Sequence, residues 1–267
     1  PEAVRDIHRE YVEAGADVIT ACSFRTTPRA FAKAGKTAKE AEEATRLAVR
    51  LAQEAIRSVH GSTLLRQGFG GQAGSPRTGH LVAGCLAPLE DCYRPDLAPD
   101  SGTCLAEHET QARIFAEAGA DLILAETFGS IREAVAALRA GRKTGLPVWI
   151  SLIPGPGPTL LDGSAWPEAV RAVAAERPDA ILANCFPAPD GMELVPDLAS
   201  TRIPFGLYAN SSAKAGATWK PGDRIDPKPY LGQARAWIGA GAGIIGGCCG
   251  TSPGHILAFR SDLPLDP

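Results

Sequence analysis

The feature that most constrains the fold of this 267-residue chain is a regular alternation of short apolar runs with longer amphipathic segments. Such alternation predicts strands followed by helices. Seven apolar runs are predicted as strands, at residues 17–24, 81–86, 120–127, 147–152, 179–185, 204–208 and 243–245. Eight segments are predicted as helices, at about 1–14, 38–60, 103–118, 130–143, 166–176, 190–198, 228–240 and 253–259. The strand runs are apolar throughout, which is typical of a parallel sheet covered by helices.

Repeating β–α units of this kind predict an α/β protein with a (β/α)8 barrel of the TIM type. Because the chain begins on a helix and supplies seven strands for eight helices, we expect the first strand of the barrel to lie upstream of Pro1. An open, doubly wound sheet is the alternative. No repeat or linker divides the sequence, so residues 1–267 are expected to form one barrel domain. The Gly-rich segment 61–80 has no clear period and is interpreted as a flexible loop insertion.

Composition narrows the functional classes. The net charge is −3 and the pI about 6.0, and no basic stripe indicates nucleic-acid binding. No apolar run reaches the roughly 18 residues that a membrane span requires. The 7 cysteines are an odd number, spread over predicted strands and loops, which is typical of reduced thiols and favours a cytoplasmic protein. A homo-oligomer remains possible.

The pair Cys248–Cys249 is the strongest candidate for chemistry. Adjacent cysteines do not easily bond to each other, because the ring would be strained. Two thiolates at the end of a strand, just before a helix, suit a soft metal such as zinc. Cys185 ends the predicted strand two before this pair, and the C-terminal strand ends meet at one face of a barrel, so the three sulfurs could converge. From the residues alone, Cys185 is equally compatible with simple packing.

Other polar residues stand at predicted strand ends. Glu126 could hold a substrate amino group or pair with a nearby arginine. Asn210 could lie beside the site or form a turn. Cys22 and Cys85 are expected to pack in the pocket wall. His255 follows Pro253 at the start of the last predicted helix and is expected to cap it or lie on the surface.

Several motifs resemble those of the homocysteine S-methyltransferase family. The segment Ile-Gly-Gly-Cys-Cys-Gly-Thr-Ser-Pro at 245–253, followed by His255-Ile256, is similar to the family's terminal motif. Asn184-Cys185 resembles its Asn-Cys motif, and Glu126-Thr127 its Glu-Thr motif. Residues 15–19 and 83–88 resemble further family blocks, so the resemblance extends from the first helix to about Ile256.

The resemblance implies a zinc enzyme that transfers a methyl group to the thiol of homocysteine, forming methionine. Cys185, Cys248 and Cys249 would bind Zn²⁺, and the substrate thiol would take the open position. Glu126, Thr127 and Asn184 are expected to contact the substrate, with Glu126 and Asn210 as the catalytic residues beside the metal. The implied partners are homocysteine and a small methyl donor, either S-methylmethionine or S-adenosylmethionine.

One departure from the family pattern keeps two alternatives open. The family normally begins with a strand carrying an Asp-Gly-Gly-like segment that contributes to the homocysteine pocket, and this sequence begins after that point. The first alternative is therefore a catalytically silent zinc-binding barrel. The second is a methyltransferase that acts on another thiol or on a selenol.

Overall fold

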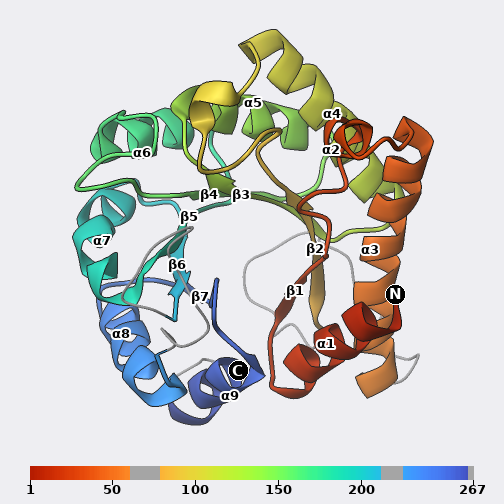
Figure 1. Cartoon of the computed structure of the whole chain (residues 1–267). Helices are drawn as coiled ribbons and strands as arrows, with labels where there is room; N and C mark the ends of the chain where they lie inside the picture. The colour runs from red at the N-terminus through yellow and green to blue at the C-terminus, as the bar shows by residue number, and fades with distance from the viewer. Residues whose placement is uncertain (61–78, 212–224, 264–267) are drawn as a thin grey trace.

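Seven parallel strands form one curled sheet at the centre of the computed structural model, which describes residues 1–60, 79–211 and 225–263 (Figure 1). The strands follow one another in sequence order and each pairs with the next. They are β1 (Val18–Thr20), β2 (Leu81–Leu86), β3 (Leu122–Phe128), β4 (Val148–Leu152), β5 (Ala180–Pro187), β6 (Phe205–Asn210) and β7 (Ile244–Ile245).

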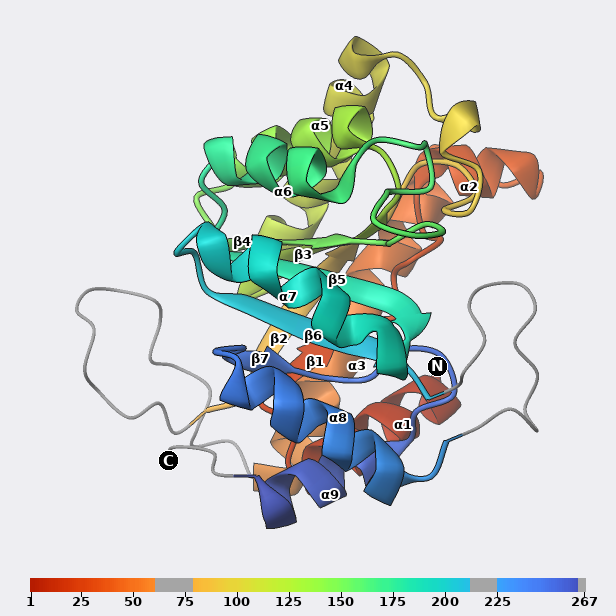
Figure 2. The ribbon, with the colours of Figure 1, turned by 90° about the vertical axis from the view of Figure 1, so that its left-hand side faces the viewer.

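Helices lie outside the curled sheet (Figures 1 and 2). The α-helices of the described residues are α1 (Glu2–Glu13), α2 (Pro28–Lys33), α3 (Ala38–His60), α4 (Ser101–Glu117), α5 (Ile131–Arg142), α6 (Trp166–Ala175), α7 (Gly191–Ser200), α8 (Pro227–Gly239) and α9 (Pro253–Asp262). Two short 3₁₀ helices, η1 (Pro95–Leu97) and η2 (Ala188–Asp190), lie in the connections. Among the described residues, no helix is both long and apolar enough to cross a membrane.

The strands are apolar on both faces because each face meets a different hydrophobic layer. In β3, Ile123 and Ala125 belong to the large cluster that includes the helices, whereas Leu122 and Leu124 belong to a second cluster made of strand residues alone. Successive side chains of a strand point to opposite faces, so the second cluster fills the inside of the curl. Burial on both sides fixes the strand positions and therefore the edge at which their C-terminal ends meet.

The curl is not closed by strand pairing. Among the described residues, β1 pairs only with β2, and β7 only with β6. The first and last helices meet beside this opening: Arg260 of α9 donates from Nε to the carbonyl of Gly15 at 2.6 Å and pairs with Asp17. Tyr11 of α1 donates from its hydroxyl to the carbonyl of Thr251 at 3.4 Å. The two edges are thus connected through side chains of the flanking helices.

This architecture confirms the predicted TIM-type barrel, to which the described residues contribute seven strands. The doubly wound alternative is wrong, because the strand order follows the sequence without the reversal that such a sheet requires. The strand predicted at 17–24 is shorter than expected, since the chain turns at Ser23, whose amide donates to the carbonyl of Ala21 at 2.7 Å. Helix α2, capped by Thr27, was not predicted. The proposed insertion 61–80 lies outside the described residues except for its last two positions.

Gly206 allows β6 and β7 to approach closely, and this predicts a stability effect. A Cβ added at Gly206 would lie 2.1 Å from the carbonyl oxygen of Ile244, which is backbone and cannot move aside alone. We expect Gly206→Ala to lower the free energy of unfolding by about 1–3 kcal/mol, as overpacking of a core does, measured by urea denaturation. Gly232→Ala in α8 is the matched control, because nothing lies within 4 Å of its added Cβ. It should stabilise by about 0.5–1 kcal/mol, and equal behaviour of the two variants would contradict the close approach.

Candidate metal centre

Three cysteine sulfurs meet at the C-terminal ends of β5 and β7. The Sγ atoms of Cys185, Cys248 and Cys249 all lie within 4.8 Å of one another, and Cys185 and Cys249 are 3.9 Å apart. Tetrahedral zinc with Zn–S bonds of about 2.3 Å places its sulfurs about 3.8 Å apart. Cys185 is buried, Cys248 partly buried and Cys249 exposed, so the trio opens to solvent on one side. The donor set fits a soft metal ion with three protein ligands.

Backbone hydrogen bonds with β6 place the two adjacent cysteines. The ladder between β6 and β7 continues beyond the regular strand, and the amide of Cys248 donates to the carbonyl of Ala209 at 2.8 Å. The amide of Cys249 donates to Oδ1 of Asn210 at 3.1 Å. Gly247 is required just before them, because an added Cβ would lie 2.5 Å from the side chain of Thr251. The Gly-Gly-Cys-Cys segment therefore runs beside the end of β6 with both sulfurs held in place.

Cys185 and Thr127 share an unusual backbone conformation. Their φ angles are 62° and 69°, in the left-handed region that non-glycine residues rarely adopt. The pairing register shifts at both places, between Ala125 and Phe128 in β3 and between Asn184 and Pro187 in β5. Such irregularities change the direction in which side chains point at the ends of strands, and they are frequent beside functional sites. Here they occur at two strand ends that meet at the candidate centre.

Asn184 connects these strand ends. Its Nδ2 donates to Oγ1 of Thr127 at 2.8 Å and lies 3.9 Å from Sγ of Cys248. Its Oδ1 accepts from the hydroxyl of Ser151 at 2.7 Å and from the amide of Thr127 at 3.2 Å. Asn184 is fully buried, so its polar atoms need these partners. The structure therefore gives Asn184 and Thr127 a supporting role around the sulfurs.

Glu126 lies beside the centre between a thiol and a phenol. Its Oε1 accepts from Sγ of Cys85 at 2.8 Å, and its Oε2 accepts from the hydroxyl of Tyr208 at 3.3 Å. Burial raises the pKa of the Glu126 carboxyl, while the two hydrogen bonds oppose that rise. Burial and the neighbouring carboxylate raise the pKa of Cys85 and of Tyr208 well above their ordinary values, so both remain protonated donors. No arginine or lysine pairs with Glu126 among the described residues.

Tyr93 reaches the centre from the loop between β2 and α4. Its hydroxyl lies 3.1 Å from Sγ of Cys185. Burial and this contact raise the pKa of the phenol, so the hydroxyl keeps its proton and can donate it to a cysteine thiolate. Within the trio, contacts from Cys185 and Cys248 lower the pKa of Cys249, because the two thiols stabilise a neighbouring thiolate.

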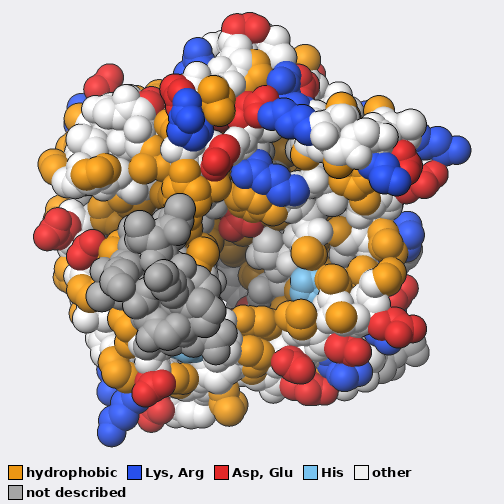
Figure 3. All heavy atoms as spheres, in the orientation of Figure 1, with side chains coloured by type: hydrophobic (Ala, Val, Ile, Leu, Met, Phe, Trp, Pro, Cys, Tyr) orange, Lys and Arg blue, Asp and Glu red, His pale blue; other side chains and the backbone are white. Residues whose placement is uncertain are grey.

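Seen down onto this face, the molecule is hollowed near its middle, with acidic side-chain atoms at the bottom of the hollow (Figure 3). Charged side chains of both signs gather along one part of the rim. A ligand that enters here reaches the C-terminal strand ends, which is where barrel enzymes place their reacting groups.

The structure brings the predicted site residues together at the C-terminal strand ends. Asn210 is fully buried, and its Oδ1 holds the Cys249 amide, so it supports the cysteine loop. Cys85 is buried as expected, and Cys22 is exposed but lies near it, since Cys22 contributes to the raised pKa of the Cys85 thiol. His255 is buried and forms a capping box with Ser252, which confirms the capping role.

Two contributors were missed from the sequence. Tyr93 lies in a loop whose course no periodicity predicts, and Ser151 ends a strand that carried no other chemical signal. The position of Ser151 at the C-terminal end of β4 was the one available hint, since strand ends meet at this face.

Comparisons with known proteins agree with this geometry. Residues 1–263 match the family described as Homocysteine S-methyltransferase. The chain is 30% identical to Homocysteine S-methyltransferase 4 of Zea mays, with 97% of this chain and 79% of the relative covered. It is 29% identical to Homocysteine S-methyltransferase YbgG of Bacillus subtilis, with 96% of this chain and 82% of the relative covered.

A solved structure has the same fold. The metallated form of the homocysteine methyltransferase MmuM from Escherichia coli superposes with a TM-score of 0.79 at 26% identity, covering 98% of this chain and 84% of that chain. The match across residues 1–263 shows that this chain belongs to the homocysteine S-methyltransferase family.

Proposed function

We propose that this chain transfers a methyl group to the thiol of homocysteine and forms methionine, with Zn²⁺ held by Cys185, Cys248 and Cys249. The observation that carries the proposal is the convergence of these three sulfurs at an open face in a member of this family. When bound, zinc would supply a Lewis acid that keeps the substrate sulfur as a thiolate at neutral pH.

The surrounding residues would fix the three ligands. Tyr93 would donate a hydrogen bond to Cys185, and Asn184 would lie against Cys248 while it bonds to Thr127 and Ser151. Asn210 would hold the backbone of Cys249. Groups that orient ligands in this way tune metal affinity and the nucleophilicity of the bound sulfur.

Glu126 would bind the amino group of homocysteine. It is a half-buried carboxylate at the centre that has no cationic partner among the described residues. A bound ammonium group would favour its ionised form and offset the desolvation that raises its pKa. Cys85 and Tyr208 would orient its two oxygens.

The transfer is a displacement at carbon, for which the protein supplies alignment. The homocysteine thiol loses its proton to solvent, and its sulfur electron pair forms a new bond to the methyl carbon. The bond between this carbon and the donor atom breaks, and that electron pair stays with the donor. With S-methylmethionine or S-adenosylmethionine as donor, a positive sulfonium becomes a neutral thioether.

A selenol acceptor is the second candidate. The chain is 26% identical, over 98% of its length, to a protein named Selenocysteine Se-methyltransferase from Brassica oleracea. Selenocysteine has one methylene fewer than homocysteine between the α-carbon and the reacting atom. Comparing kcat/KM for the two acceptors with the same donor tests which of them the site prefers, and cysteine, a thiol with the chain length of selenocysteine, separates the effect of length from that of the reacting element.

Removing any one sulfur of the trio should abolish tight zinc binding. We expect one zinc per chain in the wild type and an affinity more than about 100-fold weaker in Cys185→Ala, Cys248→Ala or Cys249→Ala, since loss of a merely supporting residue already weakens affinity by about 10–100-fold. Metal analysis after dialysis measures this. Cys104→Ala is the control, because Cys104 packs in a separate cluster with Leu89 and Ala136. Full occupancy in Cys248→Ala would refute the metal assignment.

Replacing the Glu126 carboxylate should weaken substrate binding without loss of metal. We expect Glu126→Gln to raise the KM for homocysteine by about tenfold or more, because a charge-assisted contact to the ammonium group is lost. Zinc content should be unchanged. Steady-state kinetics at saturating donor measures the KM, and Glu168→Gln, at an exposed position of α6, is the control. An unchanged KM in Glu126→Gln would show that the amino group binds elsewhere.

The same substitution should stabilise the metal-free protein at neutral pH. The pKa of Glu126 is raised in the folded state, so the folded protein binds this proton more tightly than the unfolded chain does. The free energy of unfolding of the wild type therefore falls as the pH rises from 4.5, the ordinary pKa of a glutamate, through the raised pKa of the folded state. Gln cannot ionise, so the gain in the free energy of unfolding that Glu126→Gln gives over the wild type should grow across this pH window and vanish below it. Urea unfolding at a series of pH values measures the difference. A constant difference at all pH values would contradict the raised pKa.

A further inference from the structure

Two cysteines outside the sulfur trio lie opposite each other on adjacent strands. Thr20 of β1 pairs with Ala83 of β2, and the amide of Ala21 donates to the carbonyl of Ala83 at 2.9 Å. Two residues beyond this pair, the two chains carry Cys22 and Cys85. The register therefore places the two cysteines at the same level of neighbouring parallel strands, whose backbones are about 4.8 Å apart.

Both cysteines also face the inside of the curled sheet. Side chains alternate between the two faces of a strand, and Val18 of β1 and Ala83 of β2 contribute to the inner apolar cluster. Cys22 and Cys85 stand four and two residues further on, at positions of the same face. In agreement, Sγ of Cys85 meets Glu126, and the charge of Cys22 contributes to the raised pKa of the Cys85 thiol. The two sulfurs are therefore close enough to interact.

Side-chain contacts hold together the two chain segments that follow these cysteines. The hydroxyl of Ser23 donates to the carbonyl of Cys85 at 3.1 Å. Arg25 donates from Nη1 to the carbonyl oxygens of Pro88 at 3.2 Å and of Glu90 at 2.6 Å. These contacts do not involve the sulfurs, so the thiols stay side by side whatever their chemical state.

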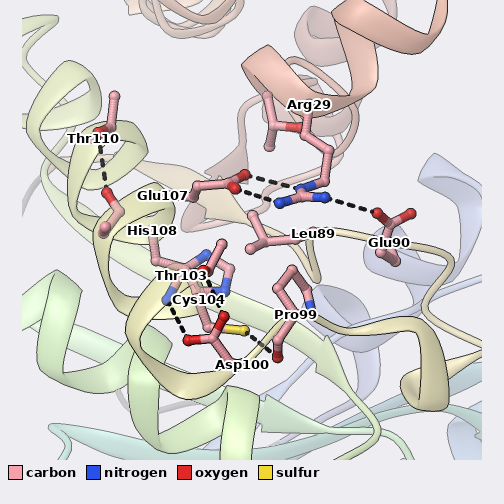
Figure 4. A network of polar contacts seen from close by, with 12 residues as sticks. Arg29, Leu89, Glu90, Pro99, Asp100, Thr103, Cys104, Glu107, His108 and Thr110 are labelled. Atoms are coloured by element: carbon pink, nitrogen blue, oxygen red, sulfur yellow. Dashed lines mark hydrogen bonds and ion pairs between the residues drawn. The ribbon is translucent and has the colours of Figure 1, made fainter.

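An ion-pair network joins the same two segments farther out (Figure 4). Arg29 of α2 donates from Nη1 to Oε1 of Glu90 at 3.2 Å and from Nε to Oε2 of Glu107 on α4 at 3.0 Å. Lys33 also pairs with Glu90. On its other side, β1 has no strand partner among the described residues. A strand paired on one side can adjust its distance to its neighbour, as the Cβ separation of about 3.5–4.5 Å in a disulfide requires.

The two thiols differ in exposure, which sets the order in which they react. Cys22 is exposed and Cys85 is buried, so an oxidant arriving from solvent reaches Cys22 first. The thiol of Cys85 donates to Oε1 of Glu126 at 2.8 Å. Glu126 can therefore accept the proton that the Cys85 sulfur must lose before it attacks another sulfur.

We propose that Cys22 and Cys85 are a modification site for a hydroperoxide, which converts them to a reversible disulfide that weakens substrate binding by Glu126. The peroxide oxidises the Cys22 sulfur to a sulfenic acid and is itself reduced to water or an alcohol. The Cys85 sulfur then attacks the Cys22 sulfur and displaces hydroxide. The proton of Cys85 passes through Glu126 to this hydroxide, which leaves as water. In total, two thiols lose two electrons and two protons to the peroxide.

The disulfide acts on the site through the carboxylate. In the reduced protein Glu126 accepts hydrogen bonds from Cys85 and Tyr208. A disulfide sulfur has no proton to donate, so the oxidised protein orients Glu126 through Tyr208 alone. The effect on substrate rests on the proposed function, in which Glu126 holds the substrate ammonium group, whereas formation of the disulfide does not.

Thiol mapping of the zinc-loaded protein tests the disulfide. The protein is treated with hydrogen peroxide, its remaining thiols are alkylated in denaturant, and the digest is analysed by mass spectrometry. We expect two peptides joined through Cys22 and Cys85, separated by dithiothreitol and absent in Cys22→Ser. Cys104→Ser is the matched control and should keep the cross-link, because the Cys104 thiol lies on α4, 3.4 Å from the carbonyl of Pro99 (Figure 4). Oxidation of Cys22 with Cys85 still alkylated, or a cross-link to any other cysteine, would overturn the proposal.

Methionine binding tests the consequence for the site. Methionine carries the same ammonium group as homocysteine but no thiol, so it cannot reduce the disulfide by exchange. After the peroxide is removed, calorimetry should show about tenfold weaker binding to the oxidised wild type than to the reduced protein, since a hydrogen bond to a charged group is lost. Dithiothreitol should restore the affinity, and Cys22→Ser should bind equally well before and after oxidation.

Zinc content is measured on the same samples and should not change. Equal methionine affinity of the reduced and cross-linked wild type would overturn the effect on the site. Loss of zinc together with affinity would assign the effect to the trio and would overturn it as well. If the reduced wild type neither binds methionine nor forms it from homocysteine, the proposed function fails, while a mapped cross-link still establishes the modification site.

Discussion

The candidate centre depends on the backbone ladder that joins β6 to the segment after β7. Regular pairing of β7 covers only Ile244 and Ile245, but the amide of Gly246 still donates to Leu207 at 3.2 Å and that of Cys248 to Ala209 at 2.8 Å. The side chain of Asn210 then takes the place of the next backbone acceptor. Two reactive sulfurs are thereby held by strand geometry, which is more rigid than a free loop.

Three thiols this close repel one another when all three are ionised, and a bound cation would offset that repulsion. Cys248 has its pKa raised by its contacts with the other two cysteines, whereas Cys249 has its pKa lowered. The metal-free trio therefore keeps protons that a metal would displace. Because Cys185 belongs to β5 and the pair follows β7, a bound ion would also join strands that are separated by β6. Metal affinity and fold stability should be coupled in this protein for that reason.

Sequence reasoning predicted the strands and the sulfur trio because both depend on local patterns. Apolar runs show the strands, and the ends of parallel strands must share one face, which brings Cys185 to Cys248 and Cys249. Tyr93 could not be predicted this way, since its place is set by contacts between Arg29, Glu90 and Arg25 that no local pattern reveals. The left-handed conformations of Thr127 and Cys185 were also unpredictable, because bulges arise from pairing with neighbouring strands.

The opening between β1 and β7 affects the two halves of the site differently. Cys248 and Cys249 are fixed from the β6 side, away from the opening, and the hydroxyl of Tyr230 lies within 3.0 Å of the carbonyls of Ala209 and Gly246. The described contacts that hold the sulfurs thus do not require a strand between β1 and β7. On the other side, Glu126 meets Cys85 of β2, and β2 is supported at this face by β1, where the hydroxyl of Ser23 donates to the carbonyl of Cys85 at 3.1 Å. The carboxylate side is therefore the part of the site that movement of the β1 edge would disturb first.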